Sequence, residues 1–453
     1  MKYTNMYDLL SHRRQIVAGL AILMGVFLMS SWTTVQAGTA DLGQILHQVE
    51  SYAPALKAAR ANTDVFKAER SVARSRFLGE IDLFAHDLHF NDNRLTRPIS
   101  PPINFSEFTF DDNQFGYGVN VQLPLDINGQ LRNGFHVFTH RAKAAREKAE
   151  NVRLQLLNNA ARLYRGLEEI SGRREALLKQ KEALQGHIKI AQTAIEVGRI
   201  APVEKLRLVA ELKVVEGRLA GLNGREAGLR ARLASLLEKQ EFTDAVLPPA
   251  REPERFLPPQ DSIGHRPDVK AAREIEEAAH SGVKAARGAY FPHFFANATW
   301  LQNQGYNGSG KNNPTWQITF QARLPLWTGG RRQAQLGQAK AQRRAAQYLN
   351  QAVLESARAE LVSAKGAWLA AEAQYRAAQS AVAAAEEVTR IQTDRFNQGR
   401  LSATDLVDAE AALANARSEL TASLARWWQA DDSLRLAVGL PPAAYNKVTS
   451  ISK

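Results

Sequence analysis

Two short segments bring an arginine and an acidic residue together, at the same spacing, behind a glycine. They are Gly198-Arg199 with Glu204, and Gly399-Arg400 with Asp405. An arginine and a carboxylate this close in sequence can form charge-assisted hydrogen bonds. A carboxylate in the first turn of a helix can also cap that helix, and Asp405 is placed to do so. The spacing therefore indicates two related charged turns.

The other reactive side chains do not form a recognisable catalytic or metal-binding motif. His136 and His140 are four residues apart, and His86 and His89 fall in a predicted strand and loop, but neither pair has supporting ligands in a known pattern. The chain has no cysteine, no phosphate-binding glycine loop and no nucleophile elbow. The sequence thus predicts no enzyme, no cofactor and no metal site.

The two charged turns belong to an internal duplication. Leu123-Pro124-Leu125 returns as Leu324-Pro325-Leu326, and Gly129 returns as Gly330, at the offset that also relates the two turns. Before each copy, residues 54–60 (PALKAAR) match residues 267–273 (PDVKAAR). Such self-similarity marks two copies of one structural unit. Each unit reads as a helix, a strand, a loop, a strand and a very long helical hairpin.

Four segments alternate apolar and polar residues with the period of a β-strand. The predicted strands cover about residues 79–91, 113–124, 291–302 and 314–326. The first has the weakest pattern, and we predict it because the duplication requires it. A strand with one apolar face fits a soluble sheet with one wet face or a transmembrane barrel.

Four strands are too few to close a barrel in a membrane, where the smallest barrels have about eight. Open strand edges in lipid would leave backbone groups without partners, at several kcal/mol each. If these strands cross a membrane, several chains must therefore share one barrel. Three chains with four strands each would supply twelve.

Two runs without proline, residues 128–197 and 330–398, keep an apolar spacing typical of long helices. About 70 helical residues extend over roughly 100 Å, which is longer than a globular core can bury. Such helices must pack along their length as a coiled coil or helical barrel. Gly198 and Gly399 suit the left-handed position that ends a helix, and Pro202 suits the first turn of a returning helix.

The N-terminal 37 residues read as an export signal. Lys2, Arg13 and Arg14 precede an apolar stretch at residues 16–32, and Val35-Gln36-Ala37 resembles a cleavage site. A retained membrane anchor is the alternative. The net charge of +12 is spread over helices and interleaved with Glu, which favours solvated helix faces over nucleic-acid binding.

Three motifs resemble the TolC-type outer-membrane efflux protein family, also called outer membrane factors. They are Arg266-Pro267-Asp268-Val269 followed by residues 283–287 (VKAAR), residues 324–330 (LPLWTGG), and residues 396–409 (FNQGRLSATDLVDA). The resemblance covers essentially the whole chain after the predicted signal. It implies a mixed α and transmembrane β fold: a homotrimer with a 12-stranded β-barrel in the outer membrane, continued by a periplasmic α-helical barrel.

The resemblance also implies a domain organisation and partners. The expected parts are the signal peptide (1–37), repeat 1 (38–240, hairpin 130–238), an equatorial linker (241–262), repeat 2 (263–440, hairpin 331–438) and a C-terminal tail (441–453). The partners would be a periplasmic adaptor (membrane fusion) protein, an inner-membrane pump of the RND or ABC type and outer-membrane lipid. The chain would be a passive exit duct in a Gram-negative outer membrane, extending into the periplasm.

In this family, acidic residues after the second hairpin tip line the periplasmic entrance and govern gating. The motif match carries that role to Asp405 and Asp408, with Arg400 close enough to tie the closed tips. Repeat 1 offers Arg199 and Glu204. Leu401 stands where the family's type member has a basic residue. The expected adaptor contacts lie around both tips, at Gly198, Pro202, Gly399, Leu401 and Ser402.

Two alternatives stay open at this point. The same fold serves as the outer-membrane component of type I protein secretion. A periplasmic coiled-coil scaffold or adaptor would belong to another class, but adaptors have one hairpin between lipoyl-like and barrel domains. The two hairpins and four strands predicted here argue against an adaptor.

Overall fold

The computed structural model describes residues 41–237, 251–259, 262–310 and 314–445. The predicted signal peptide (1–37) lies outside the described residues, as do parts of the predicted linker and tail. All described residues belong to one compact unit. The elements of this unit occur twice in the same order, as the duplication requires.

The first copy has two helices, two strands and a helical hairpin: α2 (Leu42–Tyr52), α3 (Pro54–Ser75), β1 (Glu80–Leu95), a 3-10 turn η1 (Phe105–Glu107), β2 (Phe110–Leu125), α4 (Gln130–Glu196) and α5 (Pro202–Leu236). The second copy has η2 (Ser262–His265), α6 (Pro267–Gly288), β3 (His293–Gly305), β4 (Thr315–Arg323), α7 (Arg331–Asn397) and α8 (Ala403–Ala437). The long helices α4 and α7 each have 67 residues, and α5 and α8 each have 35.

The four strands form one antiparallel sheet in the order β1-β2-β3-β4. β1 reaches Leu95, past the predicted end at 91, and has 16 residues like β2, although its sequence pattern is the weakest. β4 ends at Arg323, before the predicted end at 326. The difference at β4 follows from Pro325, which has no backbone N–H to donate to a neighbouring strand.

The sheet has one apolar and one polar face. One row across the four strands is Ile81, Val121, Ala298 and Ile318, and the next row is Asp82, Asn120, Thr299 and Gln317. Because side chains alternate between faces along each strand, the register puts the apolar rows on one side. Within the described residues, β1 pairs only with β2 and β4 only with β3, so both edges of the sheet are open.

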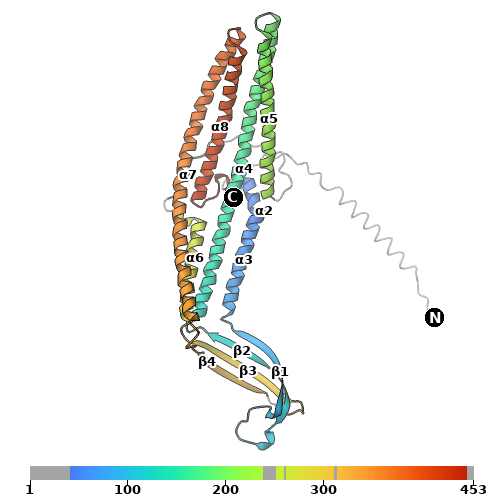
Figure 1. The fold of residues 1–453 in the computed structure, drawn as a ribbon, viewed down its shortest axis with the longest axis vertical. Coiled ribbons are helices and arrows are strands. Elements are labelled where there is room, and N and C mark those ends of the chain that lie inside the picture. Colours follow the sequence, from blue (N-terminus) through green and yellow to red (C-terminus); the bar gives the residue numbers. More distant parts are fainter. Residues whose placement is uncertain (1–40, 238–250, 260–261, 311–313, 446–453) are drawn as a thin grey trace, which may run out of the picture. The chain divides into compact units, whose positions relative to one another are not determined.

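The helices lie lengthwise beside one another, and the sheet continues from the ends of α4 and α7 (Figure 1). α4 packs against α3 and α5 on one side and against α6 and α8 on the other. Among the described helices, α7 packs mainly against α6 and α8, and the segment 251–259 also contacts it. α4 is therefore an inner helix of the unit, and α7 lies at its edge.

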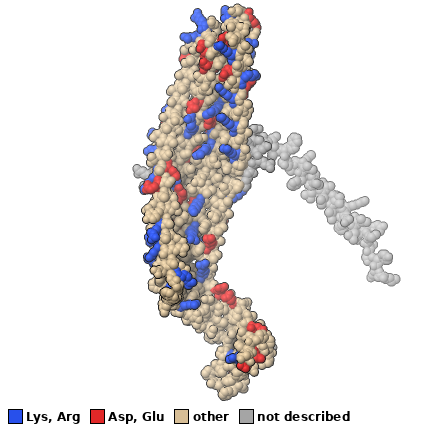
Figure 2. Space-filling model, in the orientation of Figure 1, with Lys and Arg blue, Asp and Glu red and all other residues tan. Residues whose placement is uncertain are grey.

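Charged residues of both signs are scattered over the helices on the face shown in Figure 2, while most of the sheet surface carries neither sign. In the part of the chain that the structure describes, no helix is both long enough and apolar enough to cross a membrane.

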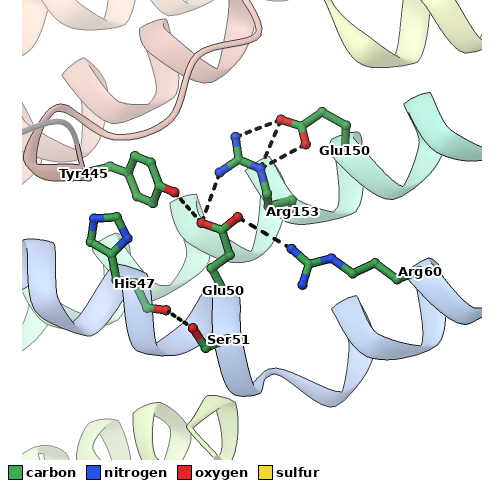
Figure 3. Close-up of polar contacts among 7 residues, drawn as sticks. All are labelled: His47, Glu50, Ser51, Arg60, Glu150, Arg153 and Tyr445. Carbon is green, nitrogen blue, oxygen red and sulfur yellow. Dashed lines mark hydrogen bonds and ion pairs between the residues drawn. The ribbon is translucent and has the colours of Figure 1, made fainter. Parts of the chain in front are cut away.

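A cluster of polar contacts anchors the C-terminal segment to α2 and α4 (Figure 3). The hydroxyl of Tyr445 donates to the carboxylate of Glu50, which also lies 3.4 Å from Arg153 Nη1 and 3.5 Å from Arg60 Nη2. The Tyr445 ring lies 4.4 Å from the His47 ring, centroid to centroid. Burial and the Glu50 carboxylate raise the pKa of Tyr445 to about 12. The hydroxyl therefore stays a donor at physiological pH.

Replacing Tyr445 with Phe should lower the free energy of unfolding by about 1–2 kcal/mol, because the bond from its hydroxyl to a charged acceptor is lost. Ser51→Ala is the matched control, since the exposed Ser51 hydroxyl only contacts the carbonyl of His47 in its own helix. The control should change stability by less than about 0.5 kcal/mol. Chemical unfolding of the purified chain in detergent measures both. Equal effects of the two substitutions would contradict an anchoring role for Tyr445.

Candidate functional site

Both hairpins end in the same backbone turn. Gly198 and Gly399 have φ of 74° and 72°, in the left-handed region where a side chain is strained. The amides of Arg199 and Arg400 then bond to the carbonyls five residues back, at 2.8 and 2.9 Å. These bonds satisfy carbonyls at the helix ends in the Schellman arrangement. The left-handed position predicted for both glycines is confirmed.

In the second tip, Ser402 is the N-cap of α8. Its Oγ accepts from the amide of Asp405 at 3.2 Å and donates to the Asp405 carboxylate at 2.7 Å. The cap satisfies one of the free N–H groups of the first turn. Asp405 thus holds the capping hydroxyl in place, while its own side chain stays exposed to solvent.

The first tip has the same backbone but lacks this cap. Ala201 stands at the N-cap of α5, with φ and ψ of −78° and 147° against −77° and 153° at Ser402, and it has no side chain that accepts a hydrogen bond. Pro202 follows in the first turn, as predicted, where its missing N–H costs nothing. Glu204 corresponds to Asp405 in the second tip. Because Ala201 has no hydroxyl, the Glu204 carboxylate does not bond to a capping side chain in its own turn.

Glu204 instead joins the two tips. Its Oε2 accepts from the backbone N–H of Ala403 at 2.8 Å, so it satisfies a free amide at the start of α8. The negative charge also lies at the positive end of that helix dipole. Arg207, one turn further along α5, pairs with Glu204 at 3.9 Å and donates to the hydroxyl of Thr404. Two side chains of the first hairpin therefore hold the start of the second.

The predicted site residues divide into those inside this contact and those outside it. Arg199, Arg400 and Asp408 are exposed. Within the described residues their side chains have no hydrogen-bond or ionic partner. Within one chain the contact between the two tips is made by Glu204 and Arg207, and the role of Arg400 in tying the closed tips stays a prediction. Sequence reasoning missed Arg207, although its position three residues after Glu204 places it on the same helix face.

Apolar side chains pack directly beneath the turns. Phe396, Ala403 and Leu406 are buried together with residues of α4 and α5, and Leu401 is half-buried against the same cluster. Leu401 is thus occupied in packing, which explains an apolar residue at this otherwise charged tip. The tips combine a fixed apolar base with an exposed rim of Arg199, Arg400, Asp405 and Asp408.

The histidine pairs considered from the sequence lie elsewhere. His140 Nδ1 lies 2.7 Å from Glu274 on α6, and the ring of His136 lies beside Phe135. Among the described residues, no group of three or more His, Cys, Asp or Glu side chains is arranged to hold a metal ion.

The profile of the outer membrane efflux protein family matches residues 45–237 and 259–440. The fusaric acid resistance protein FusA of Burkholderia cepacia is 26% identical over 233 residues, which are 48% of this chain and 43% of FusA. The outer membrane efflux protein BepC of Brucella suis is 24% identical over 353 residues, 74% of this chain and 70% of BepC. The match thus covers less than half of the length of FusA.

Solved structures share the fold. The outer membrane protein VceC of Vibrio cholerae superposes with a TM-score of 0.74 and 22% identity, over 88% of this chain and 96% of VceC. The coverage shows that both hairpins and the sheet belong to one known architecture.

Removing the Glu204 carboxylate should loosen the first turn of the other hairpin. In Glu204→Ala, the amide of Ala403 loses its acceptor, and amide exchange at residues 403–406 should become about fivefold faster, equivalent to a lost cap of roughly 1 kcal/mol. Glu204→Gln keeps an acceptor oxygen and should show a smaller change. Hydrogen–deuterium exchange with mass spectrometry measures both.

Glu196→Ala is the matched control, because Glu196 lies near the same tip and only accepts from Gln192 in its own helix. Exchange in α8 should not respond to it. Unchanged exchange at residues 403–406 in Glu204→Ala would show that the contact between the tips does not hold α8.

Proposed function

Because the chain belongs to the outer membrane efflux protein family, we propose that three copies form an outer-membrane channel, the exit duct of a tripartite efflux system. Family membership confirms the predicted resemblance and the outer-membrane location. It also agrees with the prediction that the chain is not an enzyme, since this family consists of channels. The trimer, the closed barrel and the partners are the finer parts of the proposal.

The trimer is supported by an exposed stripe on α5. The stripe begins near the tip with Val203 and Leu206 and continues with glycines at 217, 221, 224 and 228. Their spacing places the four glycines on one side of the helix. A Cβ added at any of them would meet no other atom of this chain. Each glycine weakens a helix by about 1 kcal/mol relative to alanine, so a row of four favours close approach by a helix of another chain.

α7 carries the complementary stripe. Val388 and Ile391 are exposed near its tip, and exposed alanines follow at 373, 377, 381 and 384. α5 runs away from its tip and α7 runs toward its own, so the two are antiparallel. Counted from the tips, the glycine row and the alanine row cover similar distances. Between neighbouring copies, larger apolar side chains would meet near the tips and small ones further away.

The open sheet supports the same assembly. Its edges β1 and β4 have unpaired backbone groups, and one of its faces is apolar across all four strands. Pairing β4 of one copy with β1 of the next would remove the edges without adding a strand. Three copies give twelve strands, which is within the range of closed outer-membrane barrels. The apolar face would then lie against outer-membrane lipid.

The tips would form the gate at the periplasmic end. In a trimer, Asp405 and Asp408 each occur three times around the axis, and rings of carboxylates favour cations in channels. Glu204 and Arg207 keep the two tips of one chain together, so opening would require contacts between chains to break as well. A periplasmic adaptor that binds the exposed residues of both tips, in concert with an inner-membrane pump, would shift this equilibrium.

Gly224→Leu should prevent trimer formation without unfolding the chain. The added side chain has free space within the chain, but it would separate α5 from the α7 of a neighbour. Gly186→Leu is the matched control, because Gly186 is also an exposed helical glycine with open space around it. Light scattering of the detergent-purified protein should give a trimer for the control and smaller species for Gly224→Leu. A wild-type chain that is a stable monomer would contradict the proposal.

The double variant Asp405→Asn/Asp408→Asn should weaken cation block and raise conductance in planar bilayers, because two rings of negative charge lose their charge. Asn is chosen at 405 because it can still accept the hydrogen bond from Ser402. Asp394→Asn is the control: Asp394 is an exposed acid of α7 that already pairs with Arg390 at 3.3 Å. Conductance and block equal to the wild type in the double variant would remove both residues from the gate.

A further inference from the structure

The seam between the two hairpins differs in chemistry from the seams inside them. Inside the first hairpin, α4 meets α5 through aliphatic residues, including Leu177, Leu184, Leu208 and Val215. Inside the second, α7 meets α8 through Trp368, Ala371, Tyr375, Trp427 and Leu434. Where α4 meets α8, the contact instead includes buried ionisable groups in two places.

The first place is a buried pair near the tips. His187 Nε2 of α4 lies 3.0 Å from Glu410 Oε1 of α8, and both side chains are only 8% exposed. The imidazole also lies edge-on to Phe396 of α7, and its Nδ1 has no partner among the described residues. The pair is neutral overall when His187 carries a second proton. It is a buried negative charge when His187 is neutral and Glu410 is ionised.

Among the described residues, no cation of α5 or α7 is paired with His187 or Glu410. Glu211 of α5 has one carboxylate oxygen buried without a partner within the described structure. On α7, Arg390 is exposed and pairs with Glu387 at 2.7 Å, and Glu386 pairs with Arg417 of α8 at 2.8 Å.

The second place lies further from the tips. Arg165 of α4 pairs with Glu168 at 2.8 Å, both 8% exposed, and its guanidinium lies 4.1 Å from the centroid of the Trp428 ring of α8. Asp432, one turn further along α8, is 3% exposed. Neither of its carboxylate oxygens has a hydrogen-bond partner among the described residues.

The positive and negative charges around Asp432 are almost fully paired with one another, without its carboxylate. Asp431 pairs with Arg435 at 2.8 Å and accepts from the indole of Trp368 on α7. The backbone N–H of Ala443 lies near the Asp432 carboxylate and favours its ionised form, which lowers its pKa. It does not make a hydrogen bond of normal geometry with either carboxylate oxygen. Burial raises the pKa of Asp432 to about 6, the Arg165 guanidinium opposes the rise and the Asp431 carboxylate adds to it. Burial also raises the pKa of Glu168. The cluster therefore favours a proton on one of its acids.

We propose that the contact between the hairpins of one chain is proton-linked: a proton on the buried Asp432 carboxyl holds α8 against α4, and its loss loosens this seam. The inference goes beyond the channel function and does not depend on it. The buried acid at the seam inside the second hairpin, Asp431, is paired with Arg435 and bonded to Trp368. It has partners that Asp432 lacks, so each hairpin would respond as a unit.

The direction of the pH effect follows from the burial of the Asp432 carboxyl. A carboxyl whose pKa is raised by folding contributes stability that is complete below its ordinary value and is lost as pH rises through about 6. The seam should therefore be tightest in acid and loosest at alkaline pH.

Single cysteines can test this proposal because the chain has none of its own. Thr421 of α8 faces α4, since a Cβ added to Gly172 of α4 would come within 3.0 Å of its side-chain atoms. Thr421→Cys therefore reports on the seam, and Ala371→Cys reports on the apolar contact inside the second hairpin. The measured quantity is the rate of labelling by an uncharged maleimide, divided by the rate in denaturant at the same pH, which cancels the ionisation of the thiol.

In the otherwise wild-type chain, protection at Thr421→Cys should fall between pH 4 and pH 7, by at most about 100-fold for a shift of two pKa units. Protection at Ala371→Cys should stay constant. Adding Asp432→Asn removes the buried titrating carboxyl and should abolish the fall. Glu419→Gln, an exposed acid of α8, is the charge control and should leave the fall intact.

Protection at Thr421→Cys that does not change with pH overturns the proposal, and so does a fall that persists in the Asp432→Asn background. The first result needs no substitution at the buried acids, so a variant that fails to fold does not affect it. Labelling also requires no channel activity, so its outcome is separate from the fate of the proposed function.

Discussion

A helix of 67 residues cannot be buried by a single chain of this size, and the arrangement of the molecule follows from that constraint. At about 1.5 Å per residue, α4 and α7 each extend roughly 100 Å, and the shorter helices have to be placed end to end to cover them. α3 and α5 follow one side of α4, while α6 and α8 follow the other. Among the described helices, α7 packs mainly against α6 and α8. The duplication thus produces one covered helix and one edge helix from nearly the same order of elements. The exposed side of α7 carries small and apolar residues, as does the exposed side of α5.

The duplication keeps the backbone and changes the side chains, and the tips show the consequence. Both have the same left-handed glycine and the same conformation before the returning helix. Ser402 uses its hydroxyl to cap its own helix and engages Asp405. Ala201 has no hydroxyl, so Glu204 is available to reach the other tip. A single difference at the N-cap therefore separates a self-contained turn from one that binds its neighbour.

The sequence predicted the features that depend on local chemistry. Period-2 alternation marked the strands, the absence of proline marked the long helices, and Gly198 and Gly399 marked their ends, because each of these depends on a few adjacent residues. Contacts across the repeats were not predictable in the same way. Glu204 meets Ala403, and His187 meets Glu410, only because two helices come to the same height. Arg400 was expected to tie the closed tips from its position in the motif; it takes no part in the contact within one chain, and that role stays a prediction.

The three kinds of seam suggest an order of strength within the helical part. Aliphatic and aromatic clusters inside each hairpin bury apolar area, and the acid beside the aromatic cluster, Asp431, is paired with Arg435, so these clusters should be the last to separate. The contact between hairpins buries Asp432 and a His187–Glu410 pair, and a buried charge that loses its partner costs far more than an apolar contact returns. The tips are joined by a few exposed or half-buried polar bonds, each of modest net strength. Movement that begins at the tips can therefore continue along the seam between hairpins while each hairpin remains intact.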